Sequence, residues 1–176
     1  MANPEQPSQP FLEHVPDDDT GYRLRLVRPL PCSALIDAGE RYAEVVTDIY
    51  GARSVCHIGL AASGVGFAYS GMWYRDTADG MDDIAVDLDV RSPQLFDTGG
   101  RPSVVFDNSL RDGTTLARAA GFLHRRFIYP ETFIKLIDYE DNREENIREW
   151  AAQTLGMQVL SLYKASQAGH LIVDQS

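Results

Sequence analysis

The segment "DDIAVDLDVRSPQLFDTGGRPSVVFDNSLRDGTTLARAAGFL", from Asp82 to Leu123, gives the main evidence on the fold class that the sequence predicts. It contains two strand-like runs, 82–90 and 101–107, and the residues between them show no helical pattern. A helix follows, with Asp112 or Thr114 as its cap. Adjacent strands followed by helices are typical of α+β proteins with antiparallel sheets. We therefore expect a largely antiparallel sheet.

The rest of the chain supplies further strands and two strong helices. Residues 33–50 have apolar residues at helical spacing, Ser33 as a cap and Gly51 at the end, and residues 142–155 form a second such helix that ends at Gly156. The sequence thus predicts an α+β fold with a central, mostly antiparallel sheet of about five to seven strands, packed by these two main helices. The other expected elements are strands at 22–28, 54–60, 66–75, 125–129, 157–163 and 170–174 and a short helix at 130–139.

The N-terminal residues differ in composition from the rest of the chain. Residues 1–21 are rich in Pro, Gln and Asp, and they contain five acidic residues but no Lys or Arg. Such a composition predicts an acidic, Pro-rich extended arm at 1–21, ahead of a single α+β domain at 22–176.

The totals exclude several classes of protein. The net charge of −10 disfavours direct nucleic-acid binding and suits a partner with a basic surface. No apolar run approaches the roughly 20 residues of a membrane span, and no secretion signal is seen at the start, so a cytoplasmic protein is expected. The two cysteines do not make a disulfide framework.

The aspartates of the 82–90 strand are the first candidates for a site. Alternation along a strand places Asp83, Asp87 and Asp89 on the face opposite the apolar residues. Asp87 and Asp89 could hold Mg²⁺ for nucleotidyl transfer, but the glycine turn that such enzymes carry upstream is missing. We therefore predict a solvated or partner-facing acidic face and no metal site.

Other candidates are scattered. His57, in an apolar strand, is a weak catalytic candidate together with Asp87 and Asp89. Arg125 and Arg126 are weak candidates for binding a cofactor phosphate. The sequence contains no P-loop, dinucleotide-binding or nucleophile-elbow motif. An aromatic cluster at 67–74 is core, a partner-binding surface or a small-molecule pocket. The residues predicted to bind a partner are Tyr69, Trp73, Tyr74, Asp83, Asp87 and Asp89.

The C-terminal stretch "NIREWAAQTLGMQVLSLYK" (146–164) resembles the end of Gcn5-related acetyltransferases, where a helix ends at Leu-Gly-Met before a strand. The resemblance implies acetyl-CoA as a cofactor. The sequence as a whole favours a non-catalytic interaction protein without a cofactor, either a subunit of a larger assembly or a small acidic inhibitor or immunity-type protein, which could also form a homo-oligomer. The alternatives are a small transferase that uses a nucleotide-bearing cofactor, acetyl-CoA first, and a small-ligand-binding domain with an aromatic pocket.

Overall fold

A parallel β-sheet forms the centre of the molecule. The computed structural model describes residues 12–17, 21–26, 32–108, 110, 113–138, 142–165 and 171–173. In this part of the chain one sheet has six strands in the order β4-β3-β5-β6-β7-β8. Its first five strands are parallel, and β8 is antiparallel to β7. The bounds are β3 Cys56–Leu60, β4 Ile84–Leu88, β5 Ser103–Asp107, β6 Thr132–Asp138, β7 Gln158–Ala165 and β8 Leu171–Val173.

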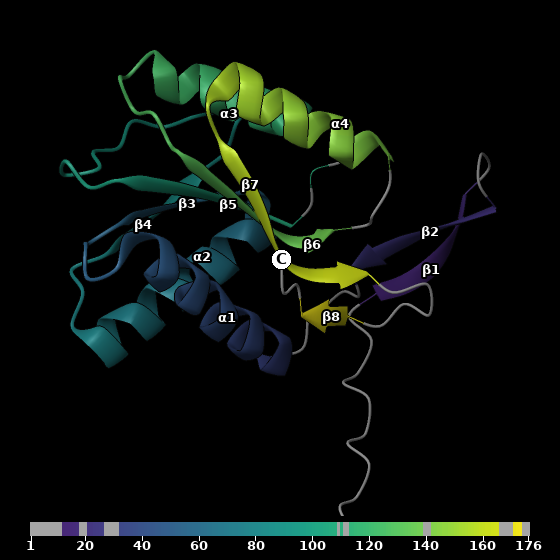
Figure 1. Cartoon of the computed structure of the whole chain (residues 1–176), viewed down its shortest axis with the longest axis horizontal. Coiled ribbons are helices and arrows are strands. Elements are labelled where there is room, and N and C mark those ends of the chain that lie inside the picture. The colour runs from purple at the N-terminus through teal and green to yellow at the C-terminus, as the bar shows by residue number, and fades with distance from the viewer. Residues whose placement is uncertain are drawn as a thin grey trace, which may run out of the picture.

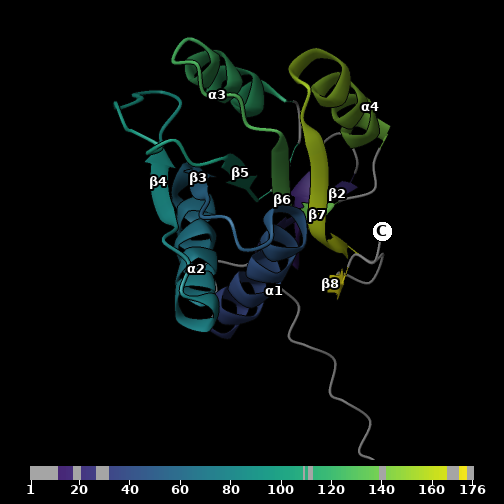
Figure 2. The same ribbon diagram turned by 60° about the vertical axis from the view of Figure 1, so that its left-hand side comes forward.

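Helices cover both faces of this sheet, so the molecule has three layers (Figures 1 and 2). Helices α1 (Cys32–Tyr50) and α2 (Ala61–Asp79) pack on one face, and α3 (Thr114–His124) and α4 (Asn142–Trp150) pack on the other. Helix α4 continues into a π-helical turn, η1 (Ala151–Leu155), which ends at Gly156 in the left-handed conformation. A search of the described residues for a helix that could cross a membrane was negative.

The N-terminal strands form a small sheet of their own. Strands β1 (Leu12–Asp17) and β2 (Gly21–Leu26) pair antiparallel, with Leu12 opposite Leu26. The predicted strand from Tyr22 onward agrees with β2, and β1 lies within residues 1–21, for which the sequence predicts an extended arm. Residues 1–11 and 18–20 of the predicted arm lie outside the described residues.

The predicted α+β fold with a mostly antiparallel sheet is wrong. Strands β4 and β5, which follow each other in the sequence, do not pair together. Both pair in parallel with β3, on its two opposite sides. The segment 89–102 brings the chain back from the end of β4 to the beginning of β5 without a helix, so the pattern of adjacent strands in the sequence hides a parallel crossover.

Residues 66–75, predicted as a strand, belong to helix α2. Gly39 of α1 and Gly71 of α2 let these two helices approach each other closely. A Cβ at Gly39 would lie 2.0 Å from Ser70 Oγ, and one at Gly71 would lie 2.0 Å from Cδ1 of Tyr42. This close contact between α1 and α2 stabilises a helix whose own propensity is poor.

Two shorter predictions also fail, and the two main helices are confirmed. Residues 130–139, predicted as a short helix, contain β6, in which every residue is buried because helices cover both its faces. Residues 125–129, predicted as a strand, form the turn after α3, where Phe127 has a φ of 60°. The predicted helices at 33–50 and 142–155 correspond to α1 and to α4 with η1.

The sheet separates two hydrophobic cores. Residues of β5 alternate between them, so that Val104 and Phe106 pack with α1 and α2, while Val105 packs with α3. On the first face Tyr42 and Phe106 meet edge to face, with ring centroids 4.9 Å apart. Because helices cover both faces, a small ligand can approach the sheet at the edge where the strands begin and at the edge where they end.

Candidate functional site

The order of strands reverses between β3 and β5. Strand β4 lies on one side of β3 and β5 on the other. The chain therefore leaves β3 toward α2 on one face and leaves β5 toward α3 on the opposite face. In open α/β sheets, ligands bind in the crevice outside the carboxyl ends of the strands at such a switch point. The candidate site is thus the edge at which β3 ends with Leu60 and β5 ends with Asp107.

The beginning of α2 lies directly against the end of β5. A Cβ at Gly64 would lie 3.1 Å from the carbonyl oxygen of Phe106 and 3.5 Å from the Cα atom of Asp107. A side chain at position 64 would therefore force the two elements apart. The glycine keeps both backbones together at the switch point.

The carboxylate of Asp107 lies at this edge and is partly buried. Burial raises the pKa of Asp107 to about 6, although the backbone N–H of Asn108 donates to Oδ1 at 2.7 Å and opposes the rise. The carbonyl oxygen of Asn108 accepts a hydrogen bond from the N–H of Ile137 at 3.0 Å, which ties the end of β5 to β6. Near neutral pH the carboxylate is charged and poorly solvated, so it is a strong hydrogen-bond acceptor for a ligand hydroxyl.

Strand β6 contributes a buried ion pair, formed by Lys135 within the strand and Asp138 at its end. The Lys135 side chain is fully buried (0% exposed), and its Nζ lies 3.2 Å from Oδ1 of Asp138. Arg148 of α4 pairs with the other carboxylate oxygen of Asp138. In the parallel register Lys135 lies opposite Asp107. Through Arg148, this cluster fixes the last turn of α4 to the end of β6.

Helix α3 begins at the same edge with a glycine. Gly113 is the N-cap residue, with a φ of 72°, and no side chain caps the helix there. A Cβ at position 113 would lie 3.2 Å from Cγ2 of Ile147 and 3.7 Å from Cζ3 of Trp150. Both the backbone conformation and the contact with α4 therefore require glycine. The first-turn N–H groups of such a helix, together with its dipole, form a site for an anion.

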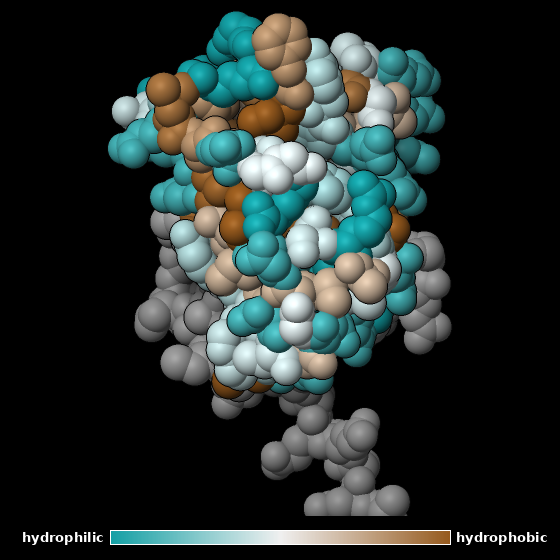
Figure 3. All heavy atoms as spheres, turned by 90° about the vertical axis from the view of Figure 1, so that its left-hand side faces the viewer, coloured by the Kyte–Doolittle hydropathy of each residue, from teal (hydrophilic) through white to brown (hydrophobic). Residues whose placement is uncertain are grey.

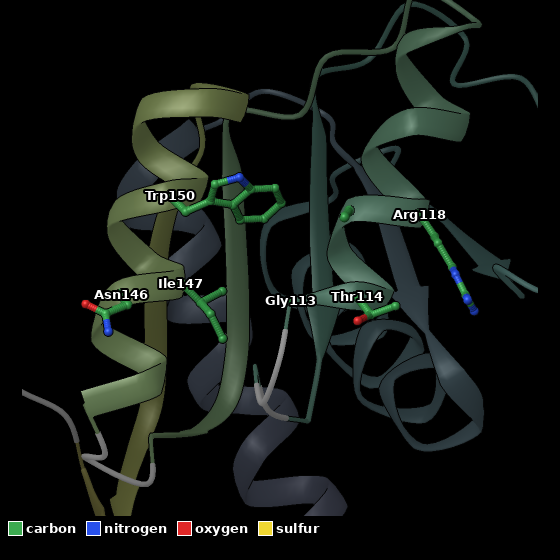
Figure 4. A pocket seen from close by; sticks show the side chains of 7 residues that line it. Gly113, Thr114, Arg118, Asn146, Ile147 and Trp150 are labelled. Atoms are coloured by element: carbon green, nitrogen blue, oxygen red, sulfur yellow. The ribbon is translucent and has the colours of Figure 1, made fainter.

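A groove separates the beginning of α3 from α4 (Figure 4). It has a volume of about 540 Å³ and is lined by seven residues, among them Gly113, Thr114, Ile147 and Trp150. In the close view Ile147 and Trp150 extend from α4 toward α3, while Arg118 extends away from α4. The groove gives the edge beside the α3 N-terminus an apolar wall.

Together these groups place a hydrogen-bond acceptor and a helix N-terminus at one edge of the sheet. The carboxylate of Asp107 can accept hydrogen bonds from hydroxyls, and the start of α3 can hold a phosphate. Among the described residues no group of three or more His, Cys, Asp or Glu side chains could hold a metal ion. A Mg²⁺ ion carried by ligand phosphates needs only one or two carboxylates, and Asp107 can supply one.

His57 belongs to a buried network at the opposite edge of the sheet. Its Nε2 lies 2.8 Å from Oδ2 of Asp83, and its Nδ1 lies 2.8 Å from the hydroxyl of Tyr42. Arg75 Nε donates to the same Oδ2 at 2.6 Å, and the N–H of Val55 donates to Oδ1 at 2.8 Å. The side chains of His57 and Asp83 are 0% exposed. The network holds α1, α2, β3 and the start of β4 together.

The pKa shifts define the protonation of this network. Burial raises the pKa of Asp83, but hydrogen bonds from His57 and Arg75 outweigh it and bring the pKa to about 2. Burial lowers the pKa of His57 against the opposing effect of Asp83. A charged carboxylate can only accept, so Nε2 of a neutral His57 carries the proton. Nδ1 then accepts from Tyr42, whose own pKa burial raises.

The structure does not bring the catalytic and cofactor candidates of the sequence together. His57 lies near the amino end of β3, whereas Asp87 and Asp89 are exposed at the far end and just beyond the end of β4. Arg125 and Arg126 follow the last residue of α3, at the edge where the strands begin. Figure 3 looks onto this end of the molecule, where α1 and α2 also finish.

The predicted partner-binding residues divide into two groups. Tyr69 and Trp73 are exposed on α2, at 46% and 58%, and Tyr74 is half-buried beside them. Asp83, predicted on the wet face of its strand, instead has a buried side chain that pairs with Arg75. Binding of a partner by the exposed residues stays a prediction.

Sequence reasoning missed Asp107, Asn108 and Gly113 as site residues. The signal was a buried strand that ends in Asp-Asn and is followed, after a short connection, by a helix beginning with Gly-Thr-Thr. This signal points to a site only if the strand is parallel, because then its carboxyl end opens at the ligand edge. Because the sequence predicts an antiparallel sheet, the end of this strand was not expected to lie at a ligand-binding edge.

Comparisons with solved structures extend this picture. An orotate phosphoribosyltransferase of Francisella tularensis aligns with a TM-score of 0.69 and 11% identity, covering 88% of this chain and 80% of that one. The enzyme of Mycobacterium tuberculosis, in complex with inorganic phosphate, gives 0.61 and 14%, with 86% of both chains covered. That of Aeropyrum pernix gives 0.57 and 18%, with 85% and 86% covered.

These likenesses define the fold. The chain has a Rossmann-like, doubly wound architecture, and within it the phosphoribosyltransferase fold. No protein-family model matches the sequence, and no curated protein matches it either.

The prediction of a non-catalytic interaction protein is contradicted by this fold. The solved chains that share it are phosphoribosyltransferases, which are enzymes. The same fold also contradicts the predictions that the protein is an inhibitor, a subunit of a complex or an α+β protein. The segment 146–164, which resembles acetyltransferases, spans most of α4, η1 and β7, and β7 pairs in parallel with β6 as part of the phosphoribosyltransferase fold.

Proposed function

We propose that the chain is a phosphoribosyltransferase-like enzyme, whose donor is a ribose 5-phosphate activated by diphosphate at C1. The observation that carries this proposal is the connection from β5 to α3. Asp107 and Asn108 lie at the carboxyl end of a strand at the switch point, and the helix that follows opens with Gly113 in a left-handed conformation. The likeness to solved phosphoribosyltransferases supports it.

Each part of the connection has a role in this proposal. The first-turn N–H groups of α3 bind the 5-phosphate, because they are free to donate at the N-terminus, which is the positive end of the helix dipole. The Asp107 carboxylate accepts hydrogen bonds from the ribose hydroxyls and stabilises the positive charge that develops on the ribose ring. Mg²⁺ that arrives with the diphosphate neutralises its charge.

The transfer is a substitution at C1 of the ribose. A nitrogen of the acceptor forms a bond to C1 while the bond between C1 and the diphosphate oxygen breaks, and the diphosphate leaves with the electron pair. The proton of the acceptor nitrogen passes to solvent. Since the solved neighbours are named for orotate, orotate is the first acceptor to test.

Calorimetric titration with 5-phosphoribosyl 1-diphosphate and Mg²⁺ tests the proposal. We expect saturable binding, weakened about tenfold by Asp107→Asn because a charge-assisted hydrogen bond is lost. Asp97→Asn is the matched control, since Asp97 is an exposed residue of the 89–102 segment. Release of diphosphate in the presence of orotate then measures transfer. A wild-type chain that binds no donor at millimolar concentrations would contradict the proposal.

Location and self-association complete the proposal. A cytoplasmic location agrees with the free, buried thiol of Cys56, because oxidising compartments favour disulfides. Formation of a homo-oligomer remains a prediction, which size-exclusion chromatography with light scattering would measure.

A further inference from the structure

We propose that the outer face of α1 and α2 is a docking surface for a Lys- and Arg-rich segment of a partner protein. This proposal does not depend on the proposed catalytic function. The centre of the surface is a groove of about 300 Å³ between the C-terminal halves of the two helices. The lining residues that matter are Glu40, Glu44 and Asp48 of α1 and Tyr74 and Asp79 of α2.

The charge that this groove presents to solvent is acidic. Of the residues that line it, Arg75 is the basic one, and its side chain is only 1% exposed. The guanidinium of Arg75 is directed inward, where it donates to Asp83, to Thr47 Oγ1 and to the carbonyl oxygen of Arg53. Arg75 therefore does not offset the four carboxylates at the groove.

One of these carboxylates has a partner on the helix surface. Glu44 pairs with Arg41 at 3.2 Å, and its side chain remains 59% exposed. An exposed pair of this kind is weak and is readily exchanged for another cation. Glu40, Asp48 and Asp79 are exposed as well.

The helix dipoles add to the negative potential. Helices α1 and α2 both run toward the amino edge of the sheet, because each leads into or follows the parallel strand β3. Their negative ends therefore lie at the same end of the molecule, and neither helix has a basic residue in its last turn. Asp48 and Asp79 lie in these last turns, where a carboxylate is unfavourable and a cation is stabilised.

Exposed aromatic rings continue the surface beyond the groove. Trp73 is 58% exposed, and its ring lies 5.1 Å from that of Tyr74, which lines the groove. Tyr69, one helical turn earlier, is 46% exposed. Trp and Tyr are favoured at protein interfaces, and their ring faces attract Lys and Arg side chains.

The combination of carboxylates and aromatic rings selects the occupant. A second copy of the chain carries a net charge of −10, so two copies repel each other, and a nucleic acid is repelled in the same way. A basic protein segment satisfies both features, since its charges meet the carboxylates and its alkyl stems pack on Trp73 and Tyr69.

An oligoarginine peptide is the probe for this surface. In a Trp150→Phe background Trp73 is the remaining tryptophan, because the chain has two, so a change in its fluorescence reports binding at α2 itself. The affinity of a labelled peptide is then measured by anisotropy for Glu40→Gln/Asp48→Asn, for Trp73→Ala, and for the control Asp87→Asn/Asp89→Asn, which removes two exposed carboxylates from the β4 region. The side chains of Glu40, Asp48, Trp73, Asp87 and Asp89 are exposed, whereas Trp150 is partly buried, so circular dichroism checks the folding of every variant and of the Trp150→Phe background.

We expect saturable quenching of Trp73 and an affinity that falls steeply between about 0.05 M and about 0.5 M salt. The Glu40→Gln/Asp48→Asn pair should weaken binding about fivefold and the control pair less than about twofold. Equal weakening by both pairs would show attraction to net charge and would overturn the proposal, as would an unchanged Trp73 signal. A dimer that Trp73→Ala dissociates would overturn it in favour of a self-interface.

Discussion

Replacing Asp83 by asparagine should severely destabilise the protein. The substitution keeps the shape of the side chain but removes the carboxylate that faces the guanidinium of Arg75, and both side chains are almost fully buried, at 0% and 1% exposed. His57 Nε2 and Arg75 Nε both converge on one oxygen of Asp83. Removing one partner of a buried pair leaves the other charge uncompensated, which costs about 3–5 kcal/mol. Total stabilities are about 5–15 kcal/mol, so this is a large part.

Urea unfolding followed by circular dichroism measures this cost, and Asp82→Asn is the control one residue away. The Asp82 side chain is 86% exposed and pairs with Arg101 at the surface. Such a pair contributes at most about 1 kcal/mol. Unfolding free energies of the two variants that differ by less than about 1 kcal/mol would refute the assignment of Asp83 to a buried ion pair.

Asp107→Asn should stabilise the protein by on the order of 2 kcal/mol at pH 8, although it weakens donor binding. The reason is that burial raises the pKa of Asp107 to about 6, so its charged form is unfavourable in the folded state. The protonated form favours folding, so the difference should vanish toward pH 4; urea titrations at both pH values measure it, and an equal effect at both would contradict the shift. Gly113→Ala should lower the free energy of unfolding by about 1–2 kcal/mol, since the φ of Gly113 is 72° and the new Cβ would press on Ile147. Thermal unfolding tests this, with Gly121→Ala in the same helix as the control, and equal melting temperatures of the two variants would contradict it. Gly71→Ala should cost at least about 1–3 kcal/mol by pushing the ring of Tyr42 out of place, which the loss of near-ultraviolet circular dichroism would report; an unchanged spectrum would contradict the α1–α2 contact.

The sequence predicted the elements whose signal is local. Helix α1 and the combined α4 and η1 have an apolar stripe and a glycine at the end, so their periodicity survives in isolation. Strand β3 likewise reads as a short apolar run. Whether the strands are parallel or antiparallel has no such local signal, because it depends on the elements that connect them. One helix interpreted as a strand therefore changes the predicted sheet from parallel to antiparallel.

Helix α2 was that misread element. Its glycines make room for neighbouring elements, since Gly71 accommodates the Tyr42 ring of α1 and Gly64 lies against the end of β5. Strand β6 was hidden differently. It is buried on both faces, and it includes Lys135 and Asp138, which are buried as a pair. Neither residue type suggests a central strand until its partner is known.

The candidate site was missed for the same reason. Asp107 and Gly113 acquire a shared role only when β5 is parallel to β3 and ends at the switch point. His57 attracted attention because histidine is common in catalysis. Its side chain is buried with Tyr42 and Asp83 away from the candidate site, and a catalytic role for it stays a prediction.

The position of β4 at the end of the sheet gives the aspartates near it a further consequence. In the described part of the chain β4 pairs with β3 on one side only, so its other side offers backbone groups to any extended segment. Such an edge is a template on which a neighbouring molecule can add a strand and start an aggregate. Asp87 is exposed within β4 and Asp89 just after it. Their charges oppose that addition, and they keep crowded copies of the chain apart.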